Sequence, residues 1–128
     1  MKTILLVEDD AKISLALGIR LRHTGYEVVT APDAVVAMAQ ALKHAPDVVV
    51  LDINLPGGDG FLVAERLRSG AATASVPLIF ITASKLPGLA ERAAQLGAVA
   101  LIEKPFSAAQ LTDALNRALG GSEERIAA

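Results

Sequence analysis

The chain has 128 residues, of which 52% are hydrophobic and 20% charged, a composition typical of one globular domain and not of a disordered segment. It contains no cysteine, which excludes disulfide bonds and thiolate metal sites. Its formal charge of −2, without a basic cluster, predicts no direct binding to DNA or RNA. No segment resembles a secretion signal or a membrane span, so we expect a cytoplasmic protein with no membrane attachment.

Five short apolar runs rich in β-branched residues are the predicted strands. Most lack the strict alternation of a half-exposed strand, which is typical of strands buried on both faces of a parallel sheet. The runs are residues 3–7, 27–31, 48–52, 77–82 and 99–103. Segments with helical spacing separate them. Five repeats of strand and helix predict a doubly wound α/β sheet with five helices covering its two faces.

The predicted helices follow the strands in turn. Apolar residues recur every three or four positions within residues 13–21, 86–96 and 111–119, and each series forms one apolar stripe. The third helix, near residues 61–68, has the weakest periodicity. We expect the domain to span residues 1–120, with residues 121–128 as a frayed tail or the start of a linker.

Residues with known preferences at helix ends support these boundaries. Asp33 is expected to cap the second helix, and Ser107 with Gln110 forms a capping box for the last one. Pro87 suits the first turn of the fourth helix. Gly97 follows that helix, where a left-handed residue is commonly needed.

Functional side chains follow four of the five predicted strands. Because the carboxyl ends of parallel strands meet at one edge of a sheet, where ligands bind, these side chains should lie close together. Each has an ordinary explanation by itself, such as acids favouring a helix dipole or a solvated lysine, but their joint arrangement predicts a site. The side chains are Glu8, Asp9 and Asp10 after the first strand, Asp52 at the end of the third, Thr82, Ala83 and Ser84 at the fourth, and Lys104 after the fifth.

The chemistry of these residues indicates a metal and a phosphoryl group. Clustered carboxylates repel one another, and a hard divalent cation such as Mg²⁺, or Mn²⁺ in its place, removes that cost. Asp52 follows a buried run and can attack phosphorus to form an acyl phosphate. Lys104 and the Thr82 hydroxyl would hold the phosphoryl oxygens, and the small Ala83 would leave room for the group.

Four motifs resemble the receiver domain of bacterial two-component response regulators. They are ILLVEDD (residues 4–10), DINLPGGDG (52–60), ITA (81–83) and EKPF (103–106), in the order and spacing of that family and covering nearly the whole chain. The resemblance implies a flavodoxin-like fold with strand order 2-1-3-4-5. It also implies that Asp52 receives a phosphoryl group from a histidine of a sensor kinase or a histidine phosphotransfer protein.

The resemblance assigns roles to the residues of these motifs. Glu8 and Asp9 would form the acidic pocket, and Thr82 and Lys104 would grip the phosphoryl group. The peptide bond before Pro105 is usually cis in the family, and prolyl bonds tolerate that state. The protein ligands of Mg²⁺ would be Asp9, Asp52 and the backbone carbonyl of Asn54.

One position departs from the family pattern. Receivers commonly carry tyrosine or phenylalanine three residues before the lysine, where this chain has Leu101. Leucine has no ring to rotate inward, so switching should depend on backbone shifts at the fourth strand and helix, or be weak. Residues 97–100 also lack an acidic pair often found in transcription-factor receivers, which favours a monomer.

We therefore expect a phosphorylation-controlled switch and not a multiple-turnover enzyme, with the face of the fourth helix and fifth strand as its output. The chain is either a stand-alone regulator or a receiver from a longer protein. Three alternatives remain: a flavodoxin-type FMN carrier, an aspartyl phosphatase and a pseudo-receiver that acts only as a docking module. Acids in the loop after the first strand disfavour FMN, and the complete set of site residues disfavours a pseudo-receiver.

Overall fold

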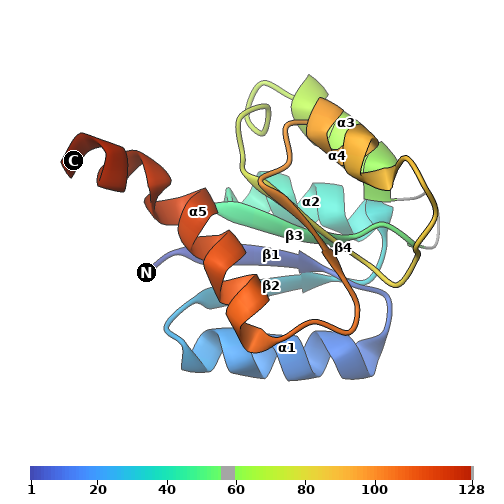
Figure 1. Cartoon of the computed structure of the whole chain (residues 1–128), viewed down its shortest axis with the longest axis horizontal. Coiled ribbons are helices and arrows are strands. Elements are labelled where there is room, and N and C mark those ends of the chain that lie inside the picture. Colours follow the sequence, from blue (N-terminus) through green and yellow to red (C-terminus); the bar gives the residue numbers. More distant parts are fainter. Residues whose placement is uncertain (56–59, 128) are drawn as a thin grey trace.

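The structure is a computed structural model that describes residues 1–55 and 60–127, with side chains described as far as residue 120. In these ranges strands and helices alternate along the chain, as the sequence predicts (Figure 1). The elements are β1 (Thr3–Val7), α1 (Ala11–His23), β2 (Glu27–Ala31), α2 (Ala34–His44), β3 (Val48–Asp52), α3 (Gly60–Ser69), β4 (Leu78–Thr82), α4 (Leu89–Gln95), β5 (Ala100–Glu103) and α5 (Ala108–Ala127).

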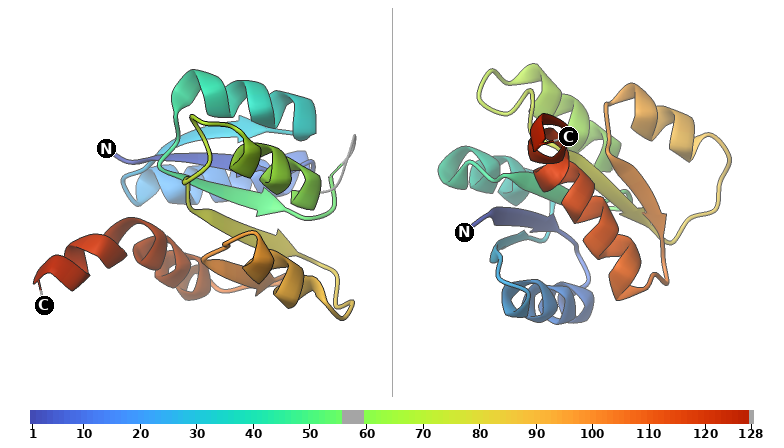
Figure 2. Two further views of the ribbon diagram at one scale, coloured as in Figure 1. Left: turned by 90° about the horizontal axis from the view of Figure 1, so that it is seen from above. Right: turned by 60° about the vertical axis from the view of Figure 1, so that its left-hand side comes forward.

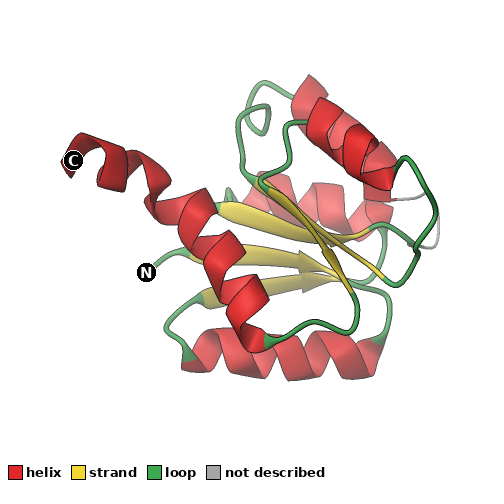
Figure 3. Ribbon diagram, in the orientation of Figure 1, coloured by secondary structure: helices red, strands yellow, loops and turns green. Residues whose placement is uncertain are grey.

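The five strands form one parallel sheet with the order β2-β1-β3-β4-β5, which confirms the predicted topology (Figure 3). The order reverses beside β1, so β1 and β3 flank the point where an open α/β sheet binds its ligands. Val7 of β1 pairs with Leu51 of β3, and Asp52 pairs with Ile81 of β4. This register brings the carboxyl ends of the central strands to the same edge.

Helices cover both faces of the sheet, and each face has its own core (Figures 1 and 2). Successive strand residues point to opposite faces. Leu5 and Val7 pack with α2, α3 and α4, whereas Ile4 and Leu6 pack with α1 and α5. Every residue of β3 and β4 is buried, which is why these strands read as continuous apolar runs.

The predicted helix ends are confirmed at three places. Asp33 accepts a hydrogen bond from the Val36 N–H (2.8 Å) and caps α2. Ser107 and Gln110 form the capping box of α5, with their side chains accepting from each other's backbone N–H groups (2.9 and 3.2 Å). Gly97 has φ = 73°, a conformation that glycine adopts without a steric cost.

The predicted start of the fourth helix is wrong. Gly88, with φ = 87°, is the residue before α4, so Pro87 lies outside the helix and not in its first turn. The left-handed conformation of Gly88 interrupts the chain there. Leu86 fitted the apolar spacing, but its side chain is 69% exposed and belongs to no helical stripe.

Other boundaries differ by small amounts. Strands β4 and β5 each begin one residue later than predicted, and α3 is one residue longer at each end. Helix α5 continues to Ala127 through the segment expected to be frayed, where glutamates, an arginine and alanine have high helix propensity. A domain boundary at residue 120 stays a prediction.

Candidate functional site

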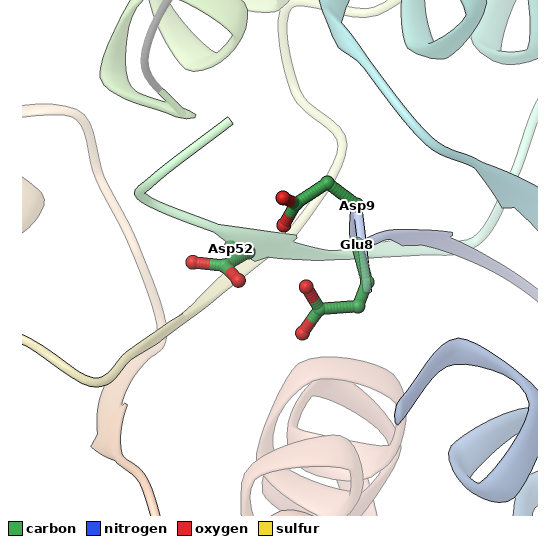
Figure 4. A group of neighbouring side chains, drawn as sticks. All are labelled: Glu8, Asp9 and Asp52. Carbon is green, nitrogen blue, oxygen red and sulfur yellow. The ribbon is translucent and has the colours of Figure 1, made fainter. Parts of the chain in front are cut away.

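Three carboxylates from β1 and β3 converge at the carboxyl edge of the sheet. Because Val7, the last residue of β1, pairs with Leu51 of β3, the residues that follow these two, Glu8 and Asp52, lie beside each other. Figure 4 shows the carboxylates of Glu8, Asp9 and Asp52 turned toward a common space, and one oxygen of each lies within 4.8 Å of the others. Glu8 and Asp52 are buried (2% and 4% exposed), while Asp9 is exposed.

Lys104 joins two of these carboxylates. Its Nζ lies 2.7 Å from Glu8 Oε1 and 2.9 Å from Asp52 Oδ2. The lysine follows β5, and its backbone N–H donates to the Thr82 carbonyl (2.7 Å), which extends the pairing of β4 with β5. The Lys104–Pro105 peptide bond is cis, as the resemblance implies. The structure thus brings Glu8, Asp9, Asp52 and Lys104 together, as the sequence predicts.

The charges of the cluster do not balance. Burial raises the pKa of Glu8 to about 7, although the hydrogen bond from Lys104 opposes this shift. Burial alone would lower the pKa of Lys104, but its hydrogen bonds to Glu8 and Asp52 outweigh that effect and raise it. The lysine therefore stays charged, and one cation faces three carboxyl groups.

The donor set fits a hard divalent cation. All three side chains offer carboxylate oxygens, which Mg²⁺ and Mn²⁺ prefer, and the exposed Asp9 leaves a side of the cluster open to water. A dication would supply the charge that Lys104 alone does not. Zinc would favour nitrogen or sulfur ligands, and this cluster has none.

Asp10 has a structural role instead. Its Oδ1 accepts hydrogen bonds from the N–H groups of Lys12 (2.9 Å) and Ile13 (3.2 Å), so it is the N-cap of α1. The ordinary explanation for acids before a helix therefore applies to this residue. Of three consecutive acids, only Glu8 and Asp9 belong to the site.

The residues at the end of β4 lie on the neighbouring strand. Thr82 is fully buried, and its Oγ1 accepts a hydrogen bond from the Ser84 N–H (2.9 Å). Ala83 is exposed and, with Lys104, is among the residues that line a groove of about 560 Å³. Leu101, at the position of the family's aromatic residue, is half-buried on β5 and packs against the core beneath α2, α3 and α4.

The loop after β3 is partly described. The Asn54 N–H donates to Asp52 Oδ1 (3.0 Å), which orients the carboxylate, and the Asn54 side chain is exposed. A role for the Asn54 carbonyl as a metal ligand stays a prediction. Residues 56–59 of the DINLPGGDG motif lie outside the described residues. Sequence reasoning assigned no role to Gly60, although its Asp-Gly dipeptide signals a constrained backbone.

A parallel 2-1-3-4-5 sheet with an acid cluster and a lysine at its carboxyl edge defines a CheY-like domain with the flavodoxin fold. Residues 4–116 match the family model described as the response regulator receiver domain. The chain belongs to this family. Its members are domains of two-component signalling.

Individual relatives agree with this assignment. The DNA-binding dual master transcriptional regulator RpaA of Synechocystis sp. is 36% identical over 98% of the chain and 52% of its own length. The chemotaxis protein CheY4 of Vibrio cholerae superposes with a TM-score of 0.86, at 31% identity, over 93% of this chain and 99% of that one. The receiver domain of the sensor histidine kinase PA1611 of Pseudomonas aeruginosa, with a magnesium ion coordinated in its active-site cleft, gives 0.84 at 33% identity, over 93% and 98%.

The chain spans about half the length of the curated relatives it matches. One of them is a DNA-binding regulator, so the expectation of no nucleic-acid binding stays a prediction for these 128 residues. No helix in the described part of the chain combines the length and apolar character needed to cross a bilayer.

Proposed function

We propose that Asp52 accepts a phosphoryl group from a phosphohistidine of a sensor kinase or a histidine phosphotransfer protein, and that the domain acts as a phosphorylation-controlled switch. One observation carries this proposal. The buried Asp52 carboxylate lies 2.9 Å from the Lys104 ammonium and shares a space with the carboxylates of Glu8 and Asp9. This arrangement supplies a nucleophile, a fixed cation and the ligands of a second cation.

Asp9, Asp52 and the backbone carbonyl of Asn54 would be the protein ligands of Mg²⁺ or Mn²⁺. When bound, the cation neutralises charge on the transferring group and on the acids around it. Glu8 contributes charge to the pocket and a hydrogen bond that holds Lys104 in place. This division of roles agrees with the burial of Glu8 and the exposure of Asp9.

The transfer itself needs one bond formed and one broken. An Asp52 carboxylate oxygen attacks phosphorus, the bond from phosphorus to the donor imidazole nitrogen breaks, and that nitrogen keeps the electron pair. The Asn54 N–H holds one Asp52 oxygen, which fixes the orientation of the carboxylate. Lys104 then turns from the carboxylate toward a phosphoryl oxygen, and the Thr82 hydroxyl donates to another.

A phosphohistidine can reach Asp52 only if its protein covers this edge of the sheet. A groove of about 560 Å³, lined in part by Ala83 and Lys104, offers mainly apolar surface for that contact. Ala83 itself has a methyl side chain, which leaves the approach open. The other residues that line the groove are Ile13, Ala16, Leu17, Arg20, Pro105 and Phe106.

Phosphorylation would bias an existing equilibrium of the α4–β5 face. Leu101 packs there without an aromatic ring, so the change would reach the surface through backbone and helix shifts. Hydrolysis of the acyl phosphate on Asp52 would return the domain to its unphosphorylated state. The domain therefore turns over its own phosphoryl group and is not a multiple-turnover enzyme.

Incubation with acetyl phosphate and Mg²⁺ tests the proposal, with intact mass as the readout. We expect one phosphoryl group on the wild type, and none on Asp52→Asn or after chelation of the metal. Asp113→Asn, at an exposed acid of α5, is the matched control and should behave like the wild type. Labelling that survives in Asp52→Asn would refute Asp52 as the acceptor. A wild type that takes no label would favour the docking-module alternative.

A further inference from the structure

Helix α3 begins in direct contact with the backbone of the residue that carries the chemistry. The Gly60 N–H donates to the Ile53 carbonyl (2.6 Å). A Cβ atom at Gly60 would lie 2.8 Å from the Ile53 Cα and closer still to the Asp52 carbonyl oxygen. Real side chains do not tolerate such distances, so only glycine allows this approach. The Asp52–Ile53 backbone and the first turn of α3 are therefore in direct contact, and a shift of that backbone toward Gly60 would push on the helix.

Helix α3 is in turn connected to α4 by Arg92. The Arg92 Cζ lies 4.3 Å above the ring of Phe61, in the first turn of α3. An Arg92 Nη also lies 3.5 Å from Glu65 Oε1, one turn further along α3. Phe61 is 1% exposed, and its ring centroid is 5.0 Å from that of Phe80 in β4. The guanidinium thus rests on a ring that is fixed in the core.

A second arginine connects the same two helices, but this one belongs to α3 and contacts α4. Arg68 of α3 donates from Nε to the carbonyl of Leu96 (2.8 Å), the C-cap residue of α4. It also donates from Nη1 to the carbonyls of Ala74 (3.0 Å) and Val76 (2.6 Å), before β4. Only the planar guanidinium reaches acceptors in several directions at once. Helix α4 is therefore held to α3 at its middle residue, Arg92, and at its C-cap, Leu96, and the two helices lie on the same face of the sheet (Figure 2).

We infer that α3 and α4 form one mechanical unit through Arg92 and Arg68, and that α3 carries a change at Asp52 to α4. The inference rests on the proposed function, because phosphorylation of Asp52 is the change to be carried. A change at Asp52 could then reach the α4 face although position 101 carries leucine and not an aromatic residue. The rival route runs through Thr82 and would move α4 independently of α3.

Hydrogen exchange of α3 and α4 amides tests the unit, measured before and after treatment with acetyl phosphate and Mg²⁺. Arg92→Gln removes the stacked cation, and Phe61→Leu removes the ring but keeps an apolar side chain. Arg66→Gln, at an exposed arginine of α3, is the matched control. Intact mass, read on each sample, reports separately whether Asp52 is phosphorylated.

In the wild type we expect phosphorylation to change the exchange of α3 and α4 together. In Arg92→Gln, labelling and the α3 response should persist, while the α4 response falls about two- to fivefold, the ratio that a contact of this kind supports. Phe61→Leu also removes the ring contact with Phe80, but it should reduce the α4 response less in the Arg92→Gln background than in the wild type, because the contact of the guanidinium with the ring is already absent there. Arg66→Gln should respond as the wild type.

An α4 response that is the same in Arg92→Gln and Arg66→Gln overturns the inference and favours the Thr82 route. Additive effects of Arg92→Gln and Phe61→Leu on α4 exchange overturn it as well. Arg68→Lys keeps the positive charge but removes the planar guanidinium that donates to the Leu96 carbonyl. An α4 response in Arg68→Lys equal to that of the wild type would contradict the role of Arg68 in connecting the two helices. A wild type that gains no phosphoryl mass refutes the proposed function instead, and this route with it.

Discussion

Lys104 and Glu8 are 96 residues apart in the chain, yet their side chains form a partly buried ion pair with 2.7 Å between Nζ and Oε1. The pair bridges the segments after β5 and β1, two strands that do not pair in the sheet. Burial raises the pKa of the Glu8 carboxyl group to about 7, and the hydrogen bond from Lys104 opposes this rise. Glu8 is therefore the group whose protonation should depend most on whether the pocket holds a cation.

We expect the stability of the metal-free protein to fall as the pH rises from about 4.5 to 7. Glu8 loses its proton near its ordinary value of 4.5 in the unfolded chain, but only near 7 when folded. Between these values the folded state binds more protons, so its advantage is complete below 4.5 and is lost as the pH rises through 7. The difference amounts to roughly 3–4 kcal/mol. Urea unfolding at a series of pH values measures it.

Glu8→Gln is the comparison for this effect, because glutamine does not titrate. Its unfolding free energy should vary less with pH over the same window, and added Mg²⁺ should reduce the pH dependence of the wild type. Parallel curves for the wild type and Glu8→Gln would mean that the pKa of Glu8 is not raised by burial.

Asp9→Asn should weaken Mg²⁺ binding by about tenfold or more while changing the stability of the metal-free protein little. Asp9 is exposed and has no hydrogen-bond partner to lose among the described residues, but it is one of the three acids that face the common space. Titration calorimetry measures the affinity, and phosphorylation by acetyl phosphate should recover at higher Mg²⁺ concentrations.

Asp10→Asn is the matched control for Asp9→Asn, since asparagine caps a helix about as well as aspartate. The two substitutions make the same chemical change at adjacent positions. Equal losses of Mg²⁺ affinity would show that net charge near α1, and not ligation by Asp9, governs binding.

Much of the fold and of the site could be predicted because the relevant signals are local or follow from topology. Asp33 and Ser107 act within one turn of their own helix, so their roles can be read from a few neighbouring residues. The convergence of Glu8, Asp52 and Lys104 follows from parallel strands whose carboxyl ends share an edge. Topology therefore predicts that these three side chains lie close together, but it does not predict which atoms form hydrogen bonds.

The features that could not be predicted depend on tertiary geometry. Glu8, Asp9 and Asp10 are alike in sequence, but the turn into α1 buries the first, turns the second to the site and makes the third a cap. The apolar spacing of Leu86 predicted a longer α4, because spacing does not reveal that a side chain is exposed. The contact of Arg92 with Phe61 depends on how two helices pack, and no local signal specifies it.

Lys104→Gln should destabilise the metal-free protein by about 1–3 kcal/mol, because it leaves two buried carboxyl groups without their cation. The value is below that of a fully buried pair because the lysine side chain is 18% exposed. Mg²⁺ should restore part of the loss by supplying positive charge to the same pocket. Thermal unfolding with and without Mg²⁺ measures both effects, and a loss that Mg²⁺ does not reduce would contradict a shared pocket.

Ala16→Glu should slow phosphotransfer from a phosphorylated histidine protein by about tenfold while leaving labelling by acetyl phosphate unchanged. Ala16 is exposed on α1 and lines the same groove as Ala83 and Lys104, so a charged side chain there would obstruct a docked protein without touching Asp52. Rates are compared with any phosphotransfer protein that labels the wild type. Ala39→Glu, at an exposed position of α2 on the opposite face of the sheet, is the control. If both substitutions slow the protein donor equally, the groove is not the docking surface; if Ala16→Glu also slows acetyl phosphate, its effect reaches Asp52 itself.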